Sequence, residues 1–294
     1  MSNPRLAKPT DLEAVLALAA RKTYAAWPSQ GEGRKEKALD SLRSLPESEY
    51  DLFVTGADVS GFLVLRKRFT RGLTGDCDSV IHDFFAPGES EILFEHAAGA
   101  ARSYGSKFIT IEISPGELNV QAMGYELESH KISVATADCP PPEGSPYSVR
   151  PAQAGDDFVI AVLNSTMLPH TLCAGRDYDI SELTFRAMDG IFQQVNRQDS
   201  QSAALVLLKG EETVGHLLLE LTDRTGYIYD LAVAQEHWGG KAVLHIMRAG
   251  SQLLFQRNIP LLVGDVSAAN LRALKIAQRY LGFAVECQRY RRKL

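Results

Sequence analysis

The apolar and polar positions of this chain follow one pattern that occurs twice. Residues 54–67 and 207–221 each consist of two apolar runs around a turn with acidic residues and glycine, which predicts a β-hairpin. The glycines of the two hairpins are offset by 154 residues: Gly56 and Gly61 in the first, Gly210 and Gly215 in the second. One hairpin is therefore repeated at a fixed distance along the chain.

Other segments repeat in the same order. "IHDFFA" at 81–86 matches "IYDLAVA" at 228–234, and "FITIEIS" at 108–114 matches "LLVGDVS" at 261–267. Each half also begins with a short strand, a polar turn with an acidic cap and an apolar helix. We interpret this order as the duplication of one domain of about 145 residues.

The boundary between the two copies is marked by its composition. "DCPPPEGSPYS" at 138–148 has four prolines, one glycine and no apolar periodicity, which is typical of a linker. The sequence therefore predicts an N-terminal domain at 1–138, a linker at 139–147 and a C-terminal domain at 148–294.

The C-terminal copy has the clearer order of elements. We expect strands at 148–151, 226–234, 260–266 and 283–291, a hairpin at 203–222, and helices at 156–168, 180–196, 240–257 and 269–280. A hairpin meander followed by β-α-β gives a mixed sheet with helices on both faces. The predicted fold class is therefore α/β, with an α+β type of mixed sheet in each copy.

Composition and charge narrow the functional classes. The 294 residues are 45% hydrophobic and carry a net charge of −5 without a basic block, so we expect no nucleic-acid partner. No run approaches the roughly 18 apolar residues of a membrane span, and the N-terminus is too polar for a signal peptide. We therefore expect a cytoplasmic protein without a membrane partner. Residues 1–146 hold 15 basic and 21 acidic side chains, whereas residues 147–294 hold 16 and 15, so the second half repels an anion less.

The cysteines and histidines do not predict a metal site. The four cysteines form no CxxC pair, which argues for free thiols: Cys77, Cys139, Cys173 and Cys287. The seven histidines form no HxH or HExxH pair: His82, His96, His130, His170, His216, His237 and His245. We expect no metal cofactor.

One glycine-rich segment stands between an apolar strand and a long helix. In "VAQEHWGGKAVL" at 233–244, Gly239 and Gly240 directly precede the predicted helix. Backbone N–H groups and the helix N-terminus can bind phosphate at such a turn. Glycine also serves a tight turn for conformational reasons alone, and the segment is neither GxGxxG nor a P-loop. Both interpretations remain open from this segment alone.

The surrounding order adds a resemblance. "IYDLAV", "EHWGGKAVL", "LLVGDVSAANLRAL" and "YLGFAVE" follow one another as do the central segments of the GCN5-related N-acetyltransferases, the GNAT superfamily. The chain thus resembles two tandem GNAT-like acyl-CoA N-acyltransferase domains, as in two-domain members such as mycothiol synthase. The resemblance implies that acetyl-CoA enters where the strand before the loop separates from its neighbour.

The resemblance also implies which residues bind acetyl-CoA. The backbone of Leu231 and Val233 pairs with pantetheine and the acyl oxygen, and the side chain of Asn270 orients the cofactor arm. The pyrophosphate loop is formed by six residues: Trp238, Gly239, Gly240, Lys241, Ala242 and Val243. Trp238 stands where the family has Arg or Gln, Lys241 where it has Gly, and Val243 where it has Gly or Ala. Lys241 supplies a charge that suits a phosphate.

Three residues are candidates for the chemistry. Amine acetylation needs a base, because the attacking nitrogen must be neutral, and Asp230 and Glu220 are the candidates, directly or through water. The acid of many relatives is a Tyr seven residues after the Asn, where this chain has Ala277. Tyr280 lies about one helical turn further on and is the candidate acid.

The first copy departs further from the family pattern. Its loop at 85–97 has one glycine and three acidic residues at the helix start, which would repel a pyrophosphate: Glu89, Glu91 and Glu95. We therefore predict that the first domain does not bind CoA and acts as a scaffold for the second.

The resulting expectation is an N-acetyltransferase that transfers an acetyl group from acetyl-CoA to a primary amine of a small molecule, by direct attack in a ternary complex. One alternative is a non-catalytic acyl-CoA binding or regulatory protein, and another is a purely structural tandem domain. A dinucleotide-dependent oxidoreductase is disfavoured, because GxGxxG follows the first strand of neither half. The oligomeric state is open, a homodimer included.

Overall fold

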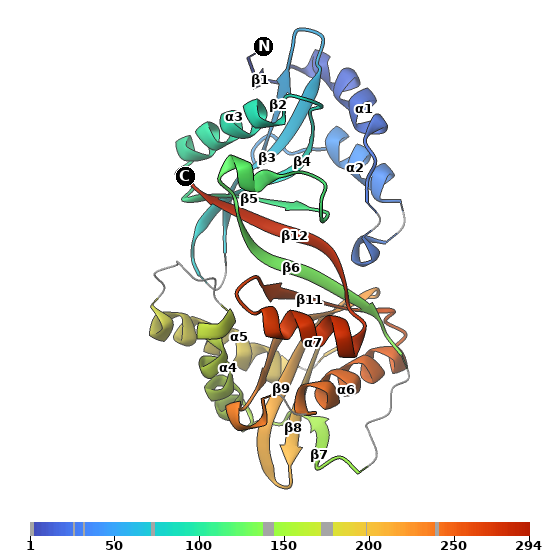
Figure 1. The fold of residues 1–294 in the computed structure, drawn as a ribbon, viewed down its shortest axis with the longest axis vertical. Coiled ribbons are helices and arrows are strands. Elements are labelled where there is room, and N and C mark those ends of the chain that lie inside the picture. The colour runs from blue at the N-terminus through green and yellow to red at the C-terminus, as the bar shows by residue number, and fades with distance from the viewer. Residues whose placement is uncertain are drawn as a thin grey trace. The chain divides into compact units, whose positions relative to one another are not determined.

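Each half of the sequence folds into a mixed sheet with helices on both faces, as its patterns predict (Figure 1). The computed structural model describes residues 3–25, 27–31, 33–71, 74–137, 144–171, 179–197, 199–238 and 241–294. The chain forms two compact units. Unit 1 comprises Met1–Glu128 and Cys287–Leu294, and unit 2 comprises Ser129–Glu286.

The sheet of unit 1 has the strand order β1-β2-β3-β4-β5-β12. Among these strands only β4 and β5 pair in parallel. The strands are β1 (Arg5–Leu6), β2 (Tyr50–Thr55), β3 (Gly61–Thr70), β4 (Cys77–Phe85), β5 (Phe108–Ile113) and β12 (Ala284–Lys293). The helices are α1 (Leu12–Arg21), α2 (Arg34–Arg43) and α3 (Ser90–Ser103), with short 3-10 helices at Pro9–Asp11, Pro28–Gln30 and Val120–Met123.

Alternation along β3 divides the core of unit 1 into two layers. Phe62 and Val64 pack with the apolar residues of α1 and α2. Leu63 and Leu65 point to the opposite face and pack with Phe94 and other residues of α3. This period of two is the sequence pattern that predicted the hairpin.

The sheet of unit 2 has the equivalent order β6-β11-β10-β9-β8-β7. The strands are β6 (Glu126–Ala135), β7 (Tyr147–Pro151), β8 (Ser202–Lys209), β9 (Glu212–Leu221), β10 (Thr225–Val233) and β11 (Leu261–Ser267). The helices are α4 (Asp157–Thr171), α5 (Ile180–Arg197), α6 (Ala242–Gln256) and α7 (Leu271–Leu281), with a 3-10 helix at Gln235–His237. On β9, Leu218 packs on the side of α4 and α5, and Leu217 and Leu219 pack on the side of α6 and α7.

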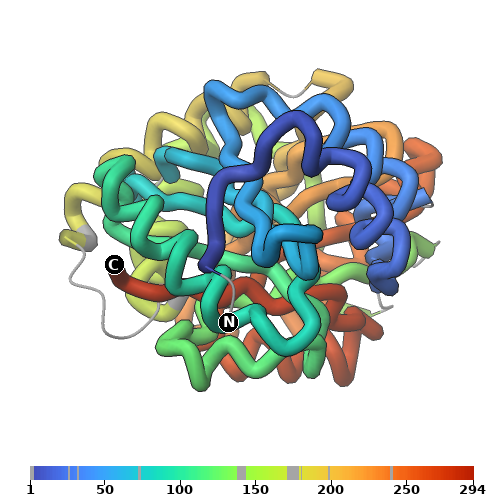
Figure 2. Tube along the Cα trace, turned by 90° about the horizontal axis from the view of Figure 1, so that it is seen from above, coloured from blue at the N-terminus to red at the C-terminus, as the bar shows by residue number. Residues whose placement is uncertain are grey.

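The last strand of each copy lies in the other copy's sheet. Residues 288–293 of β12 pair antiparallel with 108–113 of β5, and residues 129–135 of β6 pair antiparallel with 261–267 of β11. Figures 1 and 2 show the red C-terminal strand beside green segments of the first half. The compact units therefore differ from the expected domains at 1–138 and 148–294. Periodicity predicts that a segment is a strand. It does not predict the strand with which the segment pairs, because the two equivalent copies present equivalent sheet edges.

Strand registers show the duplication directly. The β3–β4 register shifts where Leu65 faces Ile81 and Val64 faces Asp83, and the β9–β10 register shifts where Ile228 and Asp230 face consecutive residues of β9. Each shift leaves one extra residue, His82 in β4 and Tyr229 in β10, which is a β-bulge. The opposing residues Val64 and Leu218 have the same 154-residue offset as the hairpin glycines. Both copies therefore bend the same strand at the same place.

A buried ionic network holds β12 in unit 1. The Arg291 side chain is 3% exposed and donates to Asp76 Oδ2 and Asp78 Oδ1, both at 2.9 Å. Arg71 joins Asp78 to Glu128 through further hydrogen bonds. The Arg291 guanidinium also lies 3.4 Å from the ring centroid of Phe108. The C-terminal strand therefore supplies a cation that two buried carboxylates of the first half need.

None of the helices in the described part of the chain combines the length and apolarity that a bilayer span requires. Cys77 is partly exposed and Cys287 is buried, whereas Cys139 and Cys173 lie outside the described residues.

Arg291→Leu should lower the free energy of unfolding of unit 1 by about 3–5 kcal/mol, because it removes the buried guanidinium that Asp76 and Asp78 share, while Arg71 stays beside Asp78. Arg289→Leu on the same strand is the matched control. Its ion pair with Glu112 is 28–29% exposed, so the loss should be about 1 kcal/mol or less. Urea unfolding, with hydrogen exchange to assign the transition to β4 and β5, measures both. Equal losses in the two variants would contradict the role given to the buried network.

Candidate active site

The centre of the sheet in unit 2 opens between two parallel strands. β10 and β11 pair over three residue pairs, from Thr225 with Leu261 to Tyr227 with Val263. Beyond Tyr227, β10 continues to Val233 beside β9, while β11 continues to Ser267 beside β6. The two strands therefore separate after Tyr227, in agreement with the expected opening before the loop.

The backbone of β10 points polar groups into this opening. The N–H of Ala234 donates to Val214 O of β9 at 2.8 Å. Because backbone directions alternate in an antiparallel pair, the N–H and C=O groups of Leu231 and Val233 point away from β9, toward the opening. A ligand strand could pair there as an extra β-strand does.

Trp238 closes part of that edge. Its indole Nε1 donates to Val233 O at 2.6 Å, and its ring meets the ring of His170 edge-on at 5.0 Å between centroids. One backbone acceptor predicted to bind a ligand is thus engaged by a side chain of the loop. This places Trp238 between the opening and the start of α6.

Three of the remaining loop residues lie at the N-terminus of α6. Gly239 and Gly240 lie outside the described residues. Lys241 is exposed and directly precedes α6. The side chains of Ala242 and Val243 pack into the core of the α6 side, so these two residues offer a ligand only their backbone.

Asn270 has a structural role at the start of α7. Its Oδ1 accepts a hydrogen bond from the backbone N–H of Ala273 at 3.1 Å, which is an N-cap. The predicted contact of this side chain with a cofactor arm remains a prediction.

Asp230 forms a hydrogen-bonded pair with a buried histidine. Asp230 faces Leu218 and His216 faces Ala232 across β9 and β10, so the two side chains are diagonal neighbours on the side of α4 and α5. His216 Nε2 lies 2.6 Å from Asp230 Oδ2. The His216 side chain is fully buried and the Asp230 side chain is 17% exposed. One acid of the predicted pair is therefore fixed by its neighbour and still reaches solvent.

Glu220 and Tyr229 lie near Asp230 on the same side of the sheet. Gln194 Nε2 of α5 donates to Glu220 Oε1 at 3.2 Å. Burial raises the pKa of Tyr229, and the carboxylates of Glu220 and Asp230 raise it further. The fold thus gathers both predicted bases around one tyrosine at the bulge.

Comparison with known proteins agrees with this geometry. Residues 170–283 match the model of the acetyltransferase (GNAT) family. A GCN5-related N-acetyltransferase from Sphaerobacter thermophilus has a TM-score of 0.60 and 16% identity, over 99% of this chain and 95% of that chain. An acetyltransferase from the GNAT family of Colwellia psychrerythraea has a TM-score of 0.52 and 11% identity, over 99% of both chains. Among curated proteins, no sequence matched the chain.

The match to the GNAT family model thus lies in the second half of the chain. The likeness to solved structures extends over the whole chain and shows the fold, which is two tandem GNAT-like domains.

The GNAT-like fold of unit 1 uses its equivalent acid internally. Asp83, at the bulge of β4, accepts hydrogen bonds from Lys22 Nζ at 2.5 Å and from the Tyr24 hydroxyl at 2.9 Å. At the 154-residue offset from His216 stands Phe62, which is fully buried. The carboxylate is the same in both copies, and its partner differs.

The helix start of unit 1 already holds an anion. Glu89 is the N-cap residue of α3 but makes no side-chain hydrogen bond to the helix; its Oε2 accepts hydrogen bonds from the hydroxyls of Thr55 and Ser60, both at 2.8 Å. These bonds lower the pKa of Glu89 and keep it ionised. Glu95 of the same helix pairs with Arg292. A carboxylate therefore sits at the place where the family pattern would put a pyrophosphate.

Tyr280, the candidate acid, lies apart from the two bases. Its side chain is 64% exposed on α7, which packs on the side of α6. Ala277, at the family's tyrosine position, is buried in that core. Asp230 and Glu220 face the other side of the sheet.

Two further polar residues near the opening were not predicted as site residues from the sequence. One is His216. The other is Asp265 of β11, whose Oδ2 accepts a hydrogen bond from the Tyr227 hydroxyl at 2.7 Å. The available signal was a histidine or an acid inside a run of otherwise apolar strand residues.

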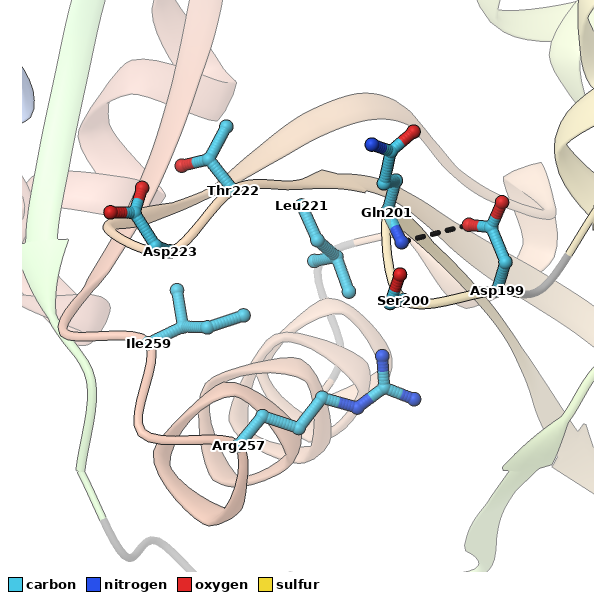
Figure 3. Close-up of a pocket in the computed structure, with 8 residues that line it drawn as sticks. All are labelled: Asp199, Ser200, Gln201, Leu221, Thr222, Asp223, Arg257 and Ile259. Atoms are coloured by element: carbon cyan, nitrogen blue, oxygen red, sulfur yellow. Dashed lines mark hydrogen bonds between the residues drawn. The ribbon is translucent and has the colours of Figure 1, made fainter.

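A separate cavity of about 920 Å³ lies before the start of β10 (Figure 3). Its lining comes from the turns at 199–201 and 221–223 and from Arg257 and Ile259 after α6. Figure 3 shows the Arg257 side chain extending toward the turn with Ser200. None of the predicted site residues that the structure describes lines this cavity, although Leu221 directly follows Glu220. In the described ranges no group of three or more His, Cys, Asp or Glu could hold a metal ion.

Gly190→Ala tests the contact of α5 with the bulge. A Cβ at Gly190 would overlap the Tyr229 hydroxyl, so the usual gain of about 0.5–1 kcal/mol from alanine in a helix should be lost. Gly99→Ala in α3 is the matched control, because nothing lies within 4 Å of its added Cβ, and it should stabilise by that amount. Thermal unfolding of both variants measures the difference. An equal gain in both would mean that Tyr229 does not pack on α5.

Proposed function

We propose that unit 2 transfers an acetyl group from acetyl-CoA to a primary amine of a small molecule, by direct attack in a ternary complex. One observation carries the proposal: the opening after Tyr227 puts the backbone of Leu231 and Val233 next to a solvent-reaching carboxylate, Asp230. An acceptor site beside a strand edge is the arrangement that such a transfer needs.

The residues present fit acetyl-CoA in type. The N–H and C=O groups of Leu231 and the N–H of Val233 would pair with the amides of pantetheine, and the start of α6 with Lys241 would take the pyrophosphate. Acetyl-CoA supplies an acetyl group activated as a thioester. Trp238 would have to release Val233 O if that carbonyl also binds.

Groups of unit 2 would take up the proton of the attacking amine and stabilise the charge on the acetyl oxygen. Asp230 would accept the proton of the attacking amine, directly or through a water, and backbone N–H groups of β10 would polarise the acetyl carbonyl. As the C–N bond forms, the C–S bond of the thioester would break and CoA would leave as its thiolate. Glu220 lies close enough to Tyr229 and Asp230 to add negative charge to the acceptor side. A thiol route is not favoured, because Cys287 belongs to unit 1.

The first copy supports an amine as acceptor. Asp83 occupies the position of Asp230 and binds the ammonium group of Lys22 at 2.5 Å. A carboxylate at this bulge is thus placed to hold a primary amine at the end of an alkyl chain. We propose that Asp230 holds the acceptor amine in the same way, while unit 1 serves as a scaffold and binds no CoA.

A second candidate function is acyl-CoA binding without turnover. Two observations favour it: Ala277 has no proton to give, and Trp238 covers a backbone acceptor of the opening. The two functions differ in whether an amine is consumed.

Acetyl-CoA should bind one site per chain, and Lys241→Glu should weaken binding about tenfold or more by reversing the charge at the start of α6. Lys209→Glu, an exposed lysine at the end of β8, is the matched control and should change binding less than about twofold. Calorimetric titration gives stoichiometry and affinity together. Two sites per chain would contradict a silent unit 1, and no binding would remove both candidate functions.

Asp230→Asn should lower kcat about 10²- to 10⁴-fold on an amine that the wild-type chain acetylates, because the amide cannot accept the proton. Asp223→Asn, an exposed acid in the turn before β10, is the control and should stay within about twofold. Free CoA release in an amine screen measures both variants. If the wild-type chain binds acetyl-CoA but consumes no amine, the binding function replaces the transferase.

A further inference from the structure

We propose that His216 is a positioning residue that holds Asp230 in the orientation and charge state of a base. The inference rests on the proposed function, and goes beyond it by assigning a role to a residue of the neighbouring strand. His216 Nε2 lies 2.6 Å from Asp230 Oδ2, and the imidazole is fully buried in the sheet.

The burial of His216 favours one tautomer of its imidazole. In the described structure its Nδ1 is buried without a hydrogen-bond partner. A proton on Nδ1 would be a buried donor without an acceptor, which is costly, so the single proton resides on Nε2. Nε2–H then donates to Oδ2 of Asp230, whose side chain reaches solvent. The bond fixes the carboxyl group and turns Oδ1 away from His216.

The first copy shows that the fold itself does not need this histidine. Phe62 stands at the equivalent place, is fully buried, and packs with α1 and α2 in the same sheet geometry. There Asp83 receives its hydrogen bonds from Lys22 and Tyr24 instead. A phenylalanine is the cheaper residue to bury, because an imidazole with an unpartnered nitrogen loses solvation. In unit 2, His216 therefore takes the part that Lys22 and Tyr24 have in unit 1. Because it binds Asp230 from the neighbouring strand, it leaves room for the acceptor amine.

The different partners of Asp83 and Asp230 affect the charge around each acid. In unit 1 the acid is neutralised by a cation from its own chain. In unit 2 a neutral donor orients the acid without adding a charge, so Asp230 keeps its negative charge for an incoming amine and its proton.

Two variants of the full chain test the proposal. His216→Phe, the residue of the first copy, should lower kcat about 10- to 100-fold with the KM for acetyl-CoA within about twofold, because the base loses its orientation. His216→Gln should recover most of this loss, to within about fivefold of wild type, because its amide N–H can still donate to Asp230. In an Asp230→Asn background, His216→Phe should change kcat less than about threefold.

His245→Phe is the matched control. His245 of α6 is another buried histidine of unit 2, at 2% exposure, and its Nδ1 is likewise buried without a partner. It should leave kcat within about twofold. Equal losses in His216→Phe and His216→Gln, or an undiminished effect in the Asp230→Asn background, would overturn the positioning role in favour of packing alone.

An NMR measurement separates this proposal from the function on which it rests. Imidazole ¹⁵N correlation spectra of the wild-type chain should show His216 as the Nε2–H tautomer, with a signal that moves in Asp230→Asn. An Nδ1–H tautomer, or an unchanged signal, would overturn the pairing whether or not any amine is acetylated. Acetyl-CoA binding without turnover in the wild-type chain, beside the expected NMR result, would instead remove the transferase and leave the pair intact.

Discussion

The separation of β10 from β11 after Tyr227 is the constraint on which the site depends. A parallel pair that ends in the middle of a sheet leaves backbone N–H and C=O groups that need partners. In unit 2 these groups belong to Leu231 and Val233, and one of them is satisfied by the indole of Trp238. The bulge at Tyr229 places Asp230 beside the same opening. The strand edge of β10, the loop with Trp238 and the side chain of Asp230 thus come together because the β10–β11 ladder ends at Tyr227.

The exchange of last strands ties the stability of unit 1 to the end of the chain. β12 brings Arg291 to the carboxylates of Asp76 and Asp78, which are buried and would oppose folding without a cation. The first copy therefore becomes complete only after the second has been synthesised. Unit 1 therefore depends on β12 through an ionic interaction that involves no ligand.

The sequence predicted those features that periodicity and turn chemistry determine. The hairpin at 203–222, the helix near 240–257 and the mixed sheet of each copy are found close to their expected bounds, because alternation and apolar faces encode them locally. The partners of β6 and β12 were not predictable, since equivalent copies present equivalent edges. Nor was the pair of His216 and Asp230, because a bulge at Tyr229 shifts the register by one residue and no local pattern marks it.

The equivalent carboxylates of the two copies, Asp83 and Asp230, have different partners. At the bulge of β4, Asp83 is closed by Lys22 and Tyr24 from its own unit, and the helix start nearby is capped by Glu89. At the bulge of β10, the equivalent acid has a buried neutral neighbour, and Lys241 precedes the helix. Two changes of partner, at the acid and at the helix start, therefore distinguish the two copies: in unit 2 the acid reaches solvent and an exposed lysine precedes the helix. Because both changes concern charge and leave the packing of the sheet alone, one fold can carry both states within a single chain.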